Sequence, residues 1–243
     1  QFERAGVERL FTVADAMRPY AHRERITRVL DGAILGSMFF EPSTRTRISF
    51  GSAFNLLGGE VRETTGFEHS AIAKGESLYD TARVLSGYSD IIVMRHPEDG
   101  SVSEFAAASR VPVINGGDGA NEHPSQALLD LYTIRSELAG RQRALDGLRV
   151  AMVGDLRFGR TVHSLSKLLS LFEGLRVSLV SPEALSMPEA VVETLREAGH
   201  EVLETDVLET GIADVDIVYS TRIQEERFAS PEEADLYLSL IHI

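Results

Sequence analysis

The sequence predicts an α/β protein with two domains, each built on a doubly wound parallel sheet. Short apolar segments rich in β-branched residues alternate with segments of helical periodicity along most of the chain. The apolar segments are nearly continuous, which is typical of parallel strands that helices cover on both faces. The alternation falls into two series, separated by one long helical segment and a polar turn. We therefore expect one domain at residues 1–140 and a second at residues 141–243.

The first series opens with an amphipathic, charged helical pattern at residues 1–18. Its four predicted strands lie at residues 32–40, 59–63, 90–95 and 111–116. Between them, helices are expected to begin near Thr44, Ser77 and Ser101.

The helical segment His123–Ala139 and the polar turn at residues 140–147 lead into the second series. Its strands are expected at residues 148–155, 175–181, 200–206 and 215–221, and its helices at residues 160–173, 187–198 and 207–212. Ligands of parallel α/β sheets bind beyond the carboxyl ends of the strands. The functional residues are therefore expected just after strands.

The composition excludes several classes of function. The 243 residues carry a formal net charge of −13, which argues against a general binder of nucleic acid or of anionic membranes. The absence of cysteine excludes disulfides, thiolate catalysis and Cys-ligated metal sites. The opening helix pattern is not that of a signal peptide, and no apolar run approaches a membrane span of about 18 residues. We expect a soluble, cytoplasmic protein whose anion sites are local clusters of Arg and Lys.

Hydroxyl and guanidinium groups gather after the first predicted strand, at Ser43, Thr44, Arg45, Thr46 and Arg47. We expect the hydroxyl groups to cap the next helix, whose N-terminal N–H groups and dipole form an anion site. An arginine in that first turn adds a forked donor matched to phosphate. Because two arginines two residues apart cannot both face one ligand, one of them is expected to be structural, with Glu41 as a candidate partner. The alternative is an ordinary capped helix with surface arginines.

The pattern F-x-E-x-S-T-R-T-R at residues 39–47 resembles the carbamoyl-phosphate signature of the aspartate and ornithine carbamoyltransferase family. Further motifs of that family follow in order: Ser70 with Lys74-Gly75-Glu76, Val93-Met94-Arg95-His96-Pro97, His123-Pro124-Ser125-Gln126, Gly154-Asp155 through Arg160-Thr161-Val162-His163, and Arg222-Ile223-Gln224 with Glu226-Arg227. The resemblance implies a carbamoyl-phosphate domain followed by an aspartate domain. It also implies transfer of the carbamoyl group to L-aspartate, a step of pyrimidine biosynthesis, with no cofactor and no metal.

Carried over residue by residue, the resemblance implies a role for each matching position. Ser43, Thr44, Arg45 and Thr46 form the phosphate loop, whereas Thr46, Arg95 and His123 donate to the carbamoyl oxygen. Gln126 binds the carbamoyl amide, and the two carboxylates of aspartate are held by Arg160, Thr161, Arg222 and Gln224. Ser70 and Lys74 belong to a loop that reaches a neighbouring active site, which implies a homotrimer, with regulatory or pathway-enzyme subunits as further partners. The expected catalytic groups are Arg45, Thr46, Lys74, Arg95 and His123.

These residue types suit carbamoyl transfer, in which an amine attacks a carbonyl carbon and phosphate leaves. Donors aimed at the carbonyl oxygen stabilise the charge that develops there. A leaving dianion and two substrate carboxylates require concentrated positive charge, which five proposed cations supply in an acidic chain. No nucleophilic side chain is needed, because phosphate can accept the proton of the amine.

Several of these positions also have a structural interpretation. His123 can be a plain helix cap, Lys74 a solvated loop cation and Arg95 an ion-pair partner. His163 lies on an apolar helical face and is expected to be a packing residue.

Three other functions compete with the main hypothesis. Ornithine is the nearest alternative acceptor, although Arg222 would repel its cationic side chain. A nucleotide-binding module is disfavoured because the segment at residues 154–159 lacks the G-x-G-x-x-G spacing. A non-catalytic scaffold is disfavoured because Arg45 and Lys74 are both present.

Family members continue beyond this sequence with a His-Pro-Leu-Pro segment and closing helices. Neither is present, and the last residues, LYLSLIHI, match nothing expected there. We therefore expect a C-terminally truncated chain that turns over poorly by itself.

Overall fold

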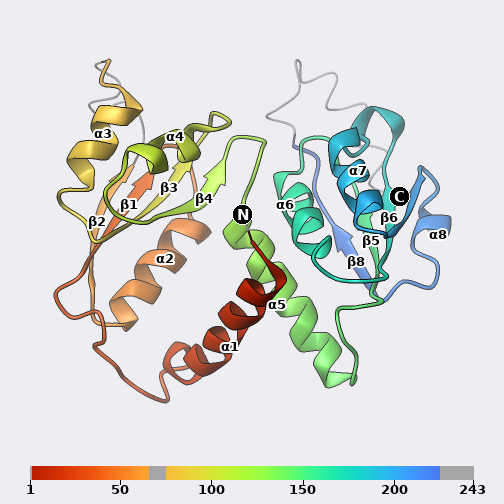
Figure 1. Cartoon of the computed structure of the whole chain (residues 1–243), viewed down its shortest axis with the longest axis horizontal. Coiled ribbons are helices and arrows are strands. Elements are labelled where there is room, and N and C mark those ends of the chain that lie inside the picture. Colours follow the sequence, from red (N-terminus) through yellow and green to blue (C-terminus); the bar gives the residue numbers. More distant parts are fainter. Residues whose placement is uncertain (1, 66–74, 225–243) are drawn as a thin grey trace. The chain divides into compact units, whose positions relative to one another are not determined.

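The computed structural model describes residues 2–65 and 75–224 and contains two compact units. One unit comprises Ala5–Ser125, and the other comprises Gln126–Ile243 together with Gln1–Arg4. Each unit contains one four-stranded sheet in which every strand pair is parallel (Figure 1). The predicted fold class, two doubly wound α/β domains, is confirmed.

The first series of elements follows the predicted alternation. It consists of α1 (Arg4–Ala21), β1 (Ile34–Phe39), α2 (Arg45–Leu56), β2 (Glu60–Thr65), α3 (Leu78–Leu85), β3 (Ile91–His96), α4 (Ser101–Ala108) and β4 (Val113–Asp118). The four predicted strands are therefore confirmed to within two residues at either end. Helices α2, α3 and α4 begin at or one residue after the expected positions, whereas α1 begins three residues later than its pattern at residues 1–18.

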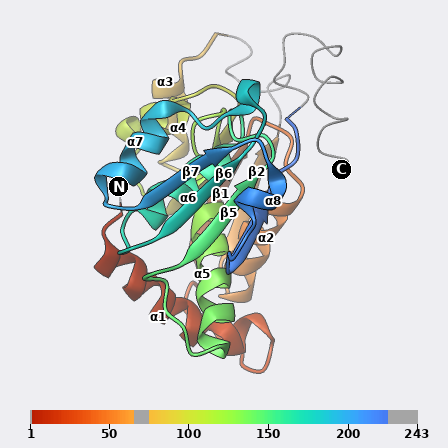
Figure 2. The same cartoon turned by 90° about the vertical axis from the view of Figure 1, so that its right-hand side faces the viewer.

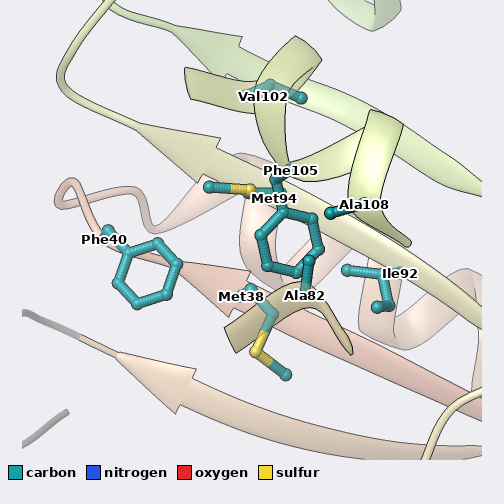
Figure 3. Close-up of a cluster of buried hydrophobic side chains, with 8 residues drawn as sticks. All are labelled: Met38, Phe40, Ala82, Ile92, Met94, Val102, Phe105 and Ala108. Carbon is teal, nitrogen blue, oxygen red and sulfur yellow. The ribbon is translucent and has the colours of Figure 1, made fainter. Parts of the chain in front are cut away.

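The first sheet is buried on both faces, which explains its nearly continuous apolar strands. One face carries a cluster formed with α3 and α4: Met38, Phe40, Ala82, Ile92, Met94, Val102, Phe105 and Ala108 (Figure 3). Alternate residues of the same strands, Leu35, Phe39 and Val93, pack with Phe50 and Phe54 of α2 on the other face. Because side chains alternate along a strand, Arg95 follows Val93 onto the α2 face.

The strand order of the first sheet is β2-β1-β3-β4. The chain leaves β1 toward β2 and then returns to the other side of β1 with β3, so the order reverses between β1 and β3. Ligands of open α/β sheets bind at such a switch point, beyond the carboxyl ends of the two strands. The segment after Phe39 and the side chain of Arg95 lie at this position, since the two residues are neighbours across the sheet.

The second series is equally regular. It consists of α5 (Pro124–Gly140), β5 (Arg149–Val153), α6 (Arg160–Leu169), β6 (Arg176–Val180), the 3-10 turn η2 (Glu183–Leu185), α7 (Glu189–Glu197), β7 (Glu201–Thr205), α8 (Leu208–Gly211) and β8 (Ile217–Ser220). The strand order is β7-β6-β5-β8, which places the switch point between β5 and β8. Figure 2 shows β7, β6 and β5 side by side in this sheet. The predicted strands are all present.

Helix α6 ends at Leu169, four residues before its expected end. Leu171 and Phe172 continue with backbone bonds to Leu168 and Leu169, three residues back, so the last turn tightens and leaves the α-helix. The apolar periodicity continues because Phe172 is buried. The expected range therefore extended to the buried Phe172 but placed the end of the α-helix four residues too late.

An ion cluster anchors the amino ends of β5 and β8. The Asp216 carboxylate bonds to the guanidinium groups of Arg149 and Arg143 and accepts from the backbone N–H of Arg149. These bonds, first from Arg149 and then from Arg143, hold the pKa of Asp216 well below its usual range.

Within residues 2–65 and 75–224, no helix is long and apolar enough to cross a membrane.

Candidate active site

The phosphate loop lies where the first strand meets the second helix. Helix α2 begins at Arg45, and Thr44 stands at its N-cap with φ −82° and ψ −55°. The expectation of a hydroxyl cap is wrong here, because Thr44 makes no side-chain cap bond. A capping side chain needs an extended backbone to reach the N–H groups of the first turn, and Thr44 is helical. The Thr44 hydroxyl therefore does not occupy the N–H groups of the first turn, which suits the binding of an external anion.

The two arginines of this turn have different environments. Nη1 of Arg47 pairs with Oε2 of Glu63 at 2.8 Å, so one arginine is structural, as predicted. The suggested partner, Glu41, was wrong, since Arg47 reaches β2, against which α2 packs. Arg45 is exposed, and its side chain makes neither an ion pair nor a hydrogen bond with the described residues. Arg45 is therefore the arginine available to an anion.

Glu41 instead orients Arg95 at the end of β3. Nε of Arg95 donates to Oε2 of Glu41 at 2.9 Å, and the arginine side chain is 13% exposed. The ion-pair interpretation of Arg95 is thus confirmed. It is compatible with a ligand role, because none of its bonds to the described residues uses the Nη atoms. A carboxylate on Nε fixes the plane of the guanidinium and directs its Nη groups elsewhere.

Two glycines at the end of β4 create room beside these groups. A Cβ at Gly117, where φ is +133°, would meet Cγ and Cδ of Arg95 at 3.3 Å. A Cβ at Gly116 would lie 3.7 Å from Cγ2 of Thr46. Thr46 and Arg95 therefore both reach the Gly116–Gly117 segment. This close approach was not predicted from the sequence, although paired glycines inside a strand pattern often mark one.

Ser125 links His123 to the end of β4 by hydrogen bonds. The Ser125 hydroxyl donates to the carbonyl of Asn115 at 3.2 Å and lies 3.3 Å from Nδ1 of His123. His123 is buried and directly precedes α5. Three expected donors to the carbamoyl oxygen, Thr46, Arg95 and His123, are thus assembled around residues 115–117.

The second unit has its own cluster at the switch point between β5 and β8. Gly154 follows β5 with φ +120°, and a Cβ there would come within 2.3 Å of the carbonyl oxygen of Thr221. The buried Asp155 carboxylate accepts from the backbone N–H of Gln224 at 3.1 Å and from that of Phe158 at 2.9 Å. Only glycine at 154 allows the chain after β8 to approach so closely. The carboxylate also occupies the loop where a nucleotide pyrophosphate would have to bind, which further disfavours a nucleotide-binding module.

The expected aspartate-binding residues flank this cluster. Arg160 begins α6 and Thr161 follows it, whereas Arg222 and Gln224 follow β8. Nη1 of Arg222 donates to the carbonyl of Ile223 at 2.9 Å, and Nε2 of Gln224 donates to the carbonyl of Arg222 at 3.2 Å. These bonds order the segment after β8. His163 is buried and bonds through Nε2 to the carbonyl of Leu156 at 2.7 Å, in agreement with its predicted packing role.

Gln126 belongs to a hydrogen-bonded chain that the sequence did not suggest. Its Nε2 donates to Oδ1 of Asp130 at 2.9 Å, and the phenol of Tyr219 donates to Oδ2 of Asp130 at 2.8 Å. The Thr161 side chain hydrogen-bonds to Tyr219 in turn. Burial raises the pKa of Asp130, while the bonds from Tyr219 and Gln126 oppose that rise. Burial likewise raises the pKa of Tyr219.

Ser70 and Lys74 lie outside the described residues. In the described part of the chain, no group of three or more His, Asp or Glu side chains is arranged to hold a metal ion.

Comparisons with known proteins agree with this fold and these motifs. The family model for the aspartate/ornithine carbamoyltransferase carbamoyl-P binding domain matches residues 1–136. The model for the Asp/Orn binding domain of the same family matches residues 146–237. The chain belongs to the aspartate/ornithine carbamoyltransferase family.

Three similar proteins show how far the likeness extends. The aspartate carbamoyltransferase catalytic subunit of Saccharophagus degradans is 75% identical over 98% of this chain and 70% of its own length. That of Cellvibrio japonicus is 70% identical over the same shares. A Trypanosoma cruzi aspartate transcarbamoylase, solved in complex with carbamoyl phosphate and aspartate, superimposes with a TM-score of 0.88 at 42% identity, over 97% of this chain and 74% of that one.

Proposed function

We propose that this chain transfers the carbamoyl group of carbamoyl phosphate to the amine of L-aspartate, yielding N-carbamoyl-L-aspartate and phosphate. One observation carries the proposal: guanidinium groups stand at or just beyond the strand ends at both switch points. Arg45 and Arg95 do so in the first unit, and Arg222 does so in the second. The names of similar relatives support aspartate as the acceptor.

In this proposal the first unit binds carbamoyl phosphate. The phosphate binds at the first turn of α2, where Arg45 adds a charge-assisted donor to the backbone N–H groups. The carbamoyl oxygen receives donors from Thr46, Arg95 and His123. Because Glu41 and Ser125 already orient two of these donors, little reorganisation is needed when charge develops on that oxygen.

The second unit binds the acceptor. Arg160 and Arg222, with Thr161 and Gln224, bind the two carboxylates of aspartate, for which the planar guanidinium fork is well suited. Gln126 binds the carbamoyl amide. The amine then attacks the carbonyl carbon, the bond to the phosphate oxygen breaks, and the departing phosphate accepts the proton of the amine. Correct positioning of two bound substrates supplies much of the acceleration.

An assay of carbamoyl transfer tests this proposal directly. The chain is incubated with carbamoyl phosphate and either aspartate or ornithine, and the carbamoylated amino acid and phosphate are both quantified. The proposal requires carbamoyl-aspartate formation in excess over carbamoyl-ornithine. Efficient use of ornithine would support the other branch of the family, and binding without turnover of either acceptor would support a non-catalytic role.

The proposal extends to a cytoplasmic homotrimer with shared active sites. It rests on the resemblance of Ser70 and Lys74 to a loop that serves a neighbouring subunit. Mixing separately inactive Arg45→Ala and Lys74→Ala chains should restore part of the activity, because some interfaces then carry both intact groups. Hybrids that form, as judged by mass spectrometry, but stay inactive would argue for sites within single subunits.

A further inference from the structure

We infer that Asp130 is a positioning residue that holds the side-chain amide of Gln126 with its oxygen toward the carbamoyl nitrogen. This inference deepens the proposed function and depends on it. It concerns a residue that lies in none of the motifs that carried the resemblance.

The local geometry of α5 fixes the orientation of the Gln126 amide. Gln126 and Asp130 are four residues apart and therefore lie on the same helix face. Nε2 of Gln126 donates to Oδ1 of Asp130 at 2.9 Å. An ionised carboxylate accepts hydrogen bonds and donates none. The nitrogen of the Gln126 amide must then face Asp130, and its oxygen must face away.

Asp130 is itself held in place by a second hydrogen bond. The phenol of Tyr219, from β8, donates to Oδ2 at 2.8 Å, so each carboxylate oxygen has its own donor. Thr161 hydrogen-bonds to Tyr219 and extends the chain to the first turn of α6. The carboxylate plane is thus set by two elements, α5 and β8, that are far apart in the sequence. Burial raises the pKa of Asp130, and the hydrogen bonds from Tyr219 and Gln126 oppose that rise and favour the ionised, accepting form.

The consequence concerns substrate choice. The carbamoyl NH2 group carries two N–H donors, and the outward Oε1 of Gln126 is an acceptor suited to it. A flipped amide would oppose these donors with N–H groups of its own. Acetyl phosphate has a methyl group in place of the NH2 group, so this hydrogen bond is not available to it. Asp130, acting through Gln126, would therefore favour carbamoyl phosphate over acetyl phosphate.

The experiment compares the binding of three probes to the full chain: carbamoyl phosphate, acetyl phosphate and inorganic phosphate. The variants are Gln126→Ala, Asp130→Asn, their combination and Tyr219→Phe. Glu137→Gln is the control, since it changes the same charge at an exposed position of α5. Dissociation constants are measured by titration calorimetry at constant salt.

Asp130→Asn should weaken carbamoyl phosphate binding about tenfold, which corresponds to one hydrogen bond of about 1.4 kcal/mol. The affinity of Asp130→Asn for acetyl phosphate should change less than about twofold. The control Glu137→Gln should change the affinity for carbamoyl phosphate and for acetyl phosphate by less than about twofold as well. The combined variant should bind carbamoyl phosphate no more weakly than Gln126→Ala, because both changes remove one coupled interaction. Tyr219→Phe should show a smaller selective loss in the same direction.

Other outcomes overturn the inference. Equal weakening of all three probes by Asp130→Asn would mean that Asp130 only supports the fold, and additive losses in the combined variant would separate it from Gln126. If Asp130→Asn does not fold, Tyr219→Phe replaces it in the test. An unchanged preference of Tyr219→Phe for carbamoyl phosphate over acetyl phosphate would then overturn the inference. An unmodified chain that binds carbamoyl phosphate no better than inorganic phosphate would refute the proposed function itself. The inference alone fails if the unmodified chain prefers carbamoyl phosphate to acetyl phosphate and the Asp130 and Tyr219 variants keep the same preference.

Discussion

Replacing Arg45 with alanine should weaken phosphate binding without lowering the stability of the first unit. The side chain is exposed and makes no ion pair or hydrogen bond with the described residues, so its loss removes no internal contact there. The free energy of unfolding should change by less than about 0.5 kcal/mol. A charge-assisted hydrogen bond to the ligand contributes about 1.5–3 kcal/mol, which corresponds to a rise in Kd of about 10- to 150-fold.

Arg47→Ala is the matched control for this prediction. It removes the same charge from the same helix turn, but from a side chain already paired with Glu63 at 2.8 Å. Loss of a partly exposed ion pair should lower the free energy of unfolding by at most about 1 kcal/mol. Phosphate affinity should fall less than about threefold, because charge effects without contact are screened over about 8 Å at 0.15 M salt.

The two variants are compared by calorimetric titration with inorganic phosphate and carbamoyl phosphate at 0.15 M salt, and by urea unfolding. The predicted pattern is a crossover, in which Arg45→Ala affects binding and Arg47→Ala affects stability. Equal losses of affinity would mean that the site responds to net charge and not to a defined contact. Unchanged affinity in Arg45→Ala would remove the first turn of α2 from the phosphate site.

Three further predictions concern the second unit. Gly154→Ala should lower the free energy of unfolding by about 2–4 kcal/mol, because its φ is +120° and the new Cβ would lie 2.3 Å from a carbonyl oxygen. Gly140→Ala, at a helix end with open space, should be neutral or slightly stabilising in the same thermal unfolding experiment. Asp216→Asn should cost about 1–3 kcal/mol at pH 7. Because the folded pKa of Asp216 is depressed, its stabilisation is complete above the ordinary value of 3.8 and is lost as the pH falls below it. Urea unfolding should therefore show a weaker acid dependence in this variant, and an unchanged dependence would refute the role of the cluster. Arg222→Ala should raise the KM for aspartate far more than that for carbamoyl phosphate, whereas equal effects would make Arg222 structural.

The sequence by itself determined the fold class and the positions of the strands. A doubly wound sheet buries both faces of its strands, so each strand is a continuous apolar run that is visible locally. The two core clusters around β1 and β3 show the physical reason, since adjacent residues such as Met38 and Phe39 belong to opposite faces. The hydroxyl and arginine residues after β1 were equally visible, because the rule that ligands bind beyond strand ends needs only the strand positions.

Only the tertiary structure decided which side chains are partners. The sequence suggested Glu41 as a partner of one of the two arginines, Arg45 or Arg47, but the neighbouring strands β1 and β3 bring Glu41 to Arg95. It suggested a capping hydroxyl, but the backbone angles of Thr44 exclude that bond.

The contact between Asp130 and Tyr219 joins residues that are 89 positions apart. Local patterns carry information on periodicity and on turn chemistry, which act over a few residues. A hydrogen bond between distant elements depends instead on strand order and register, which the whole fold must establish before any pair of side chains can meet.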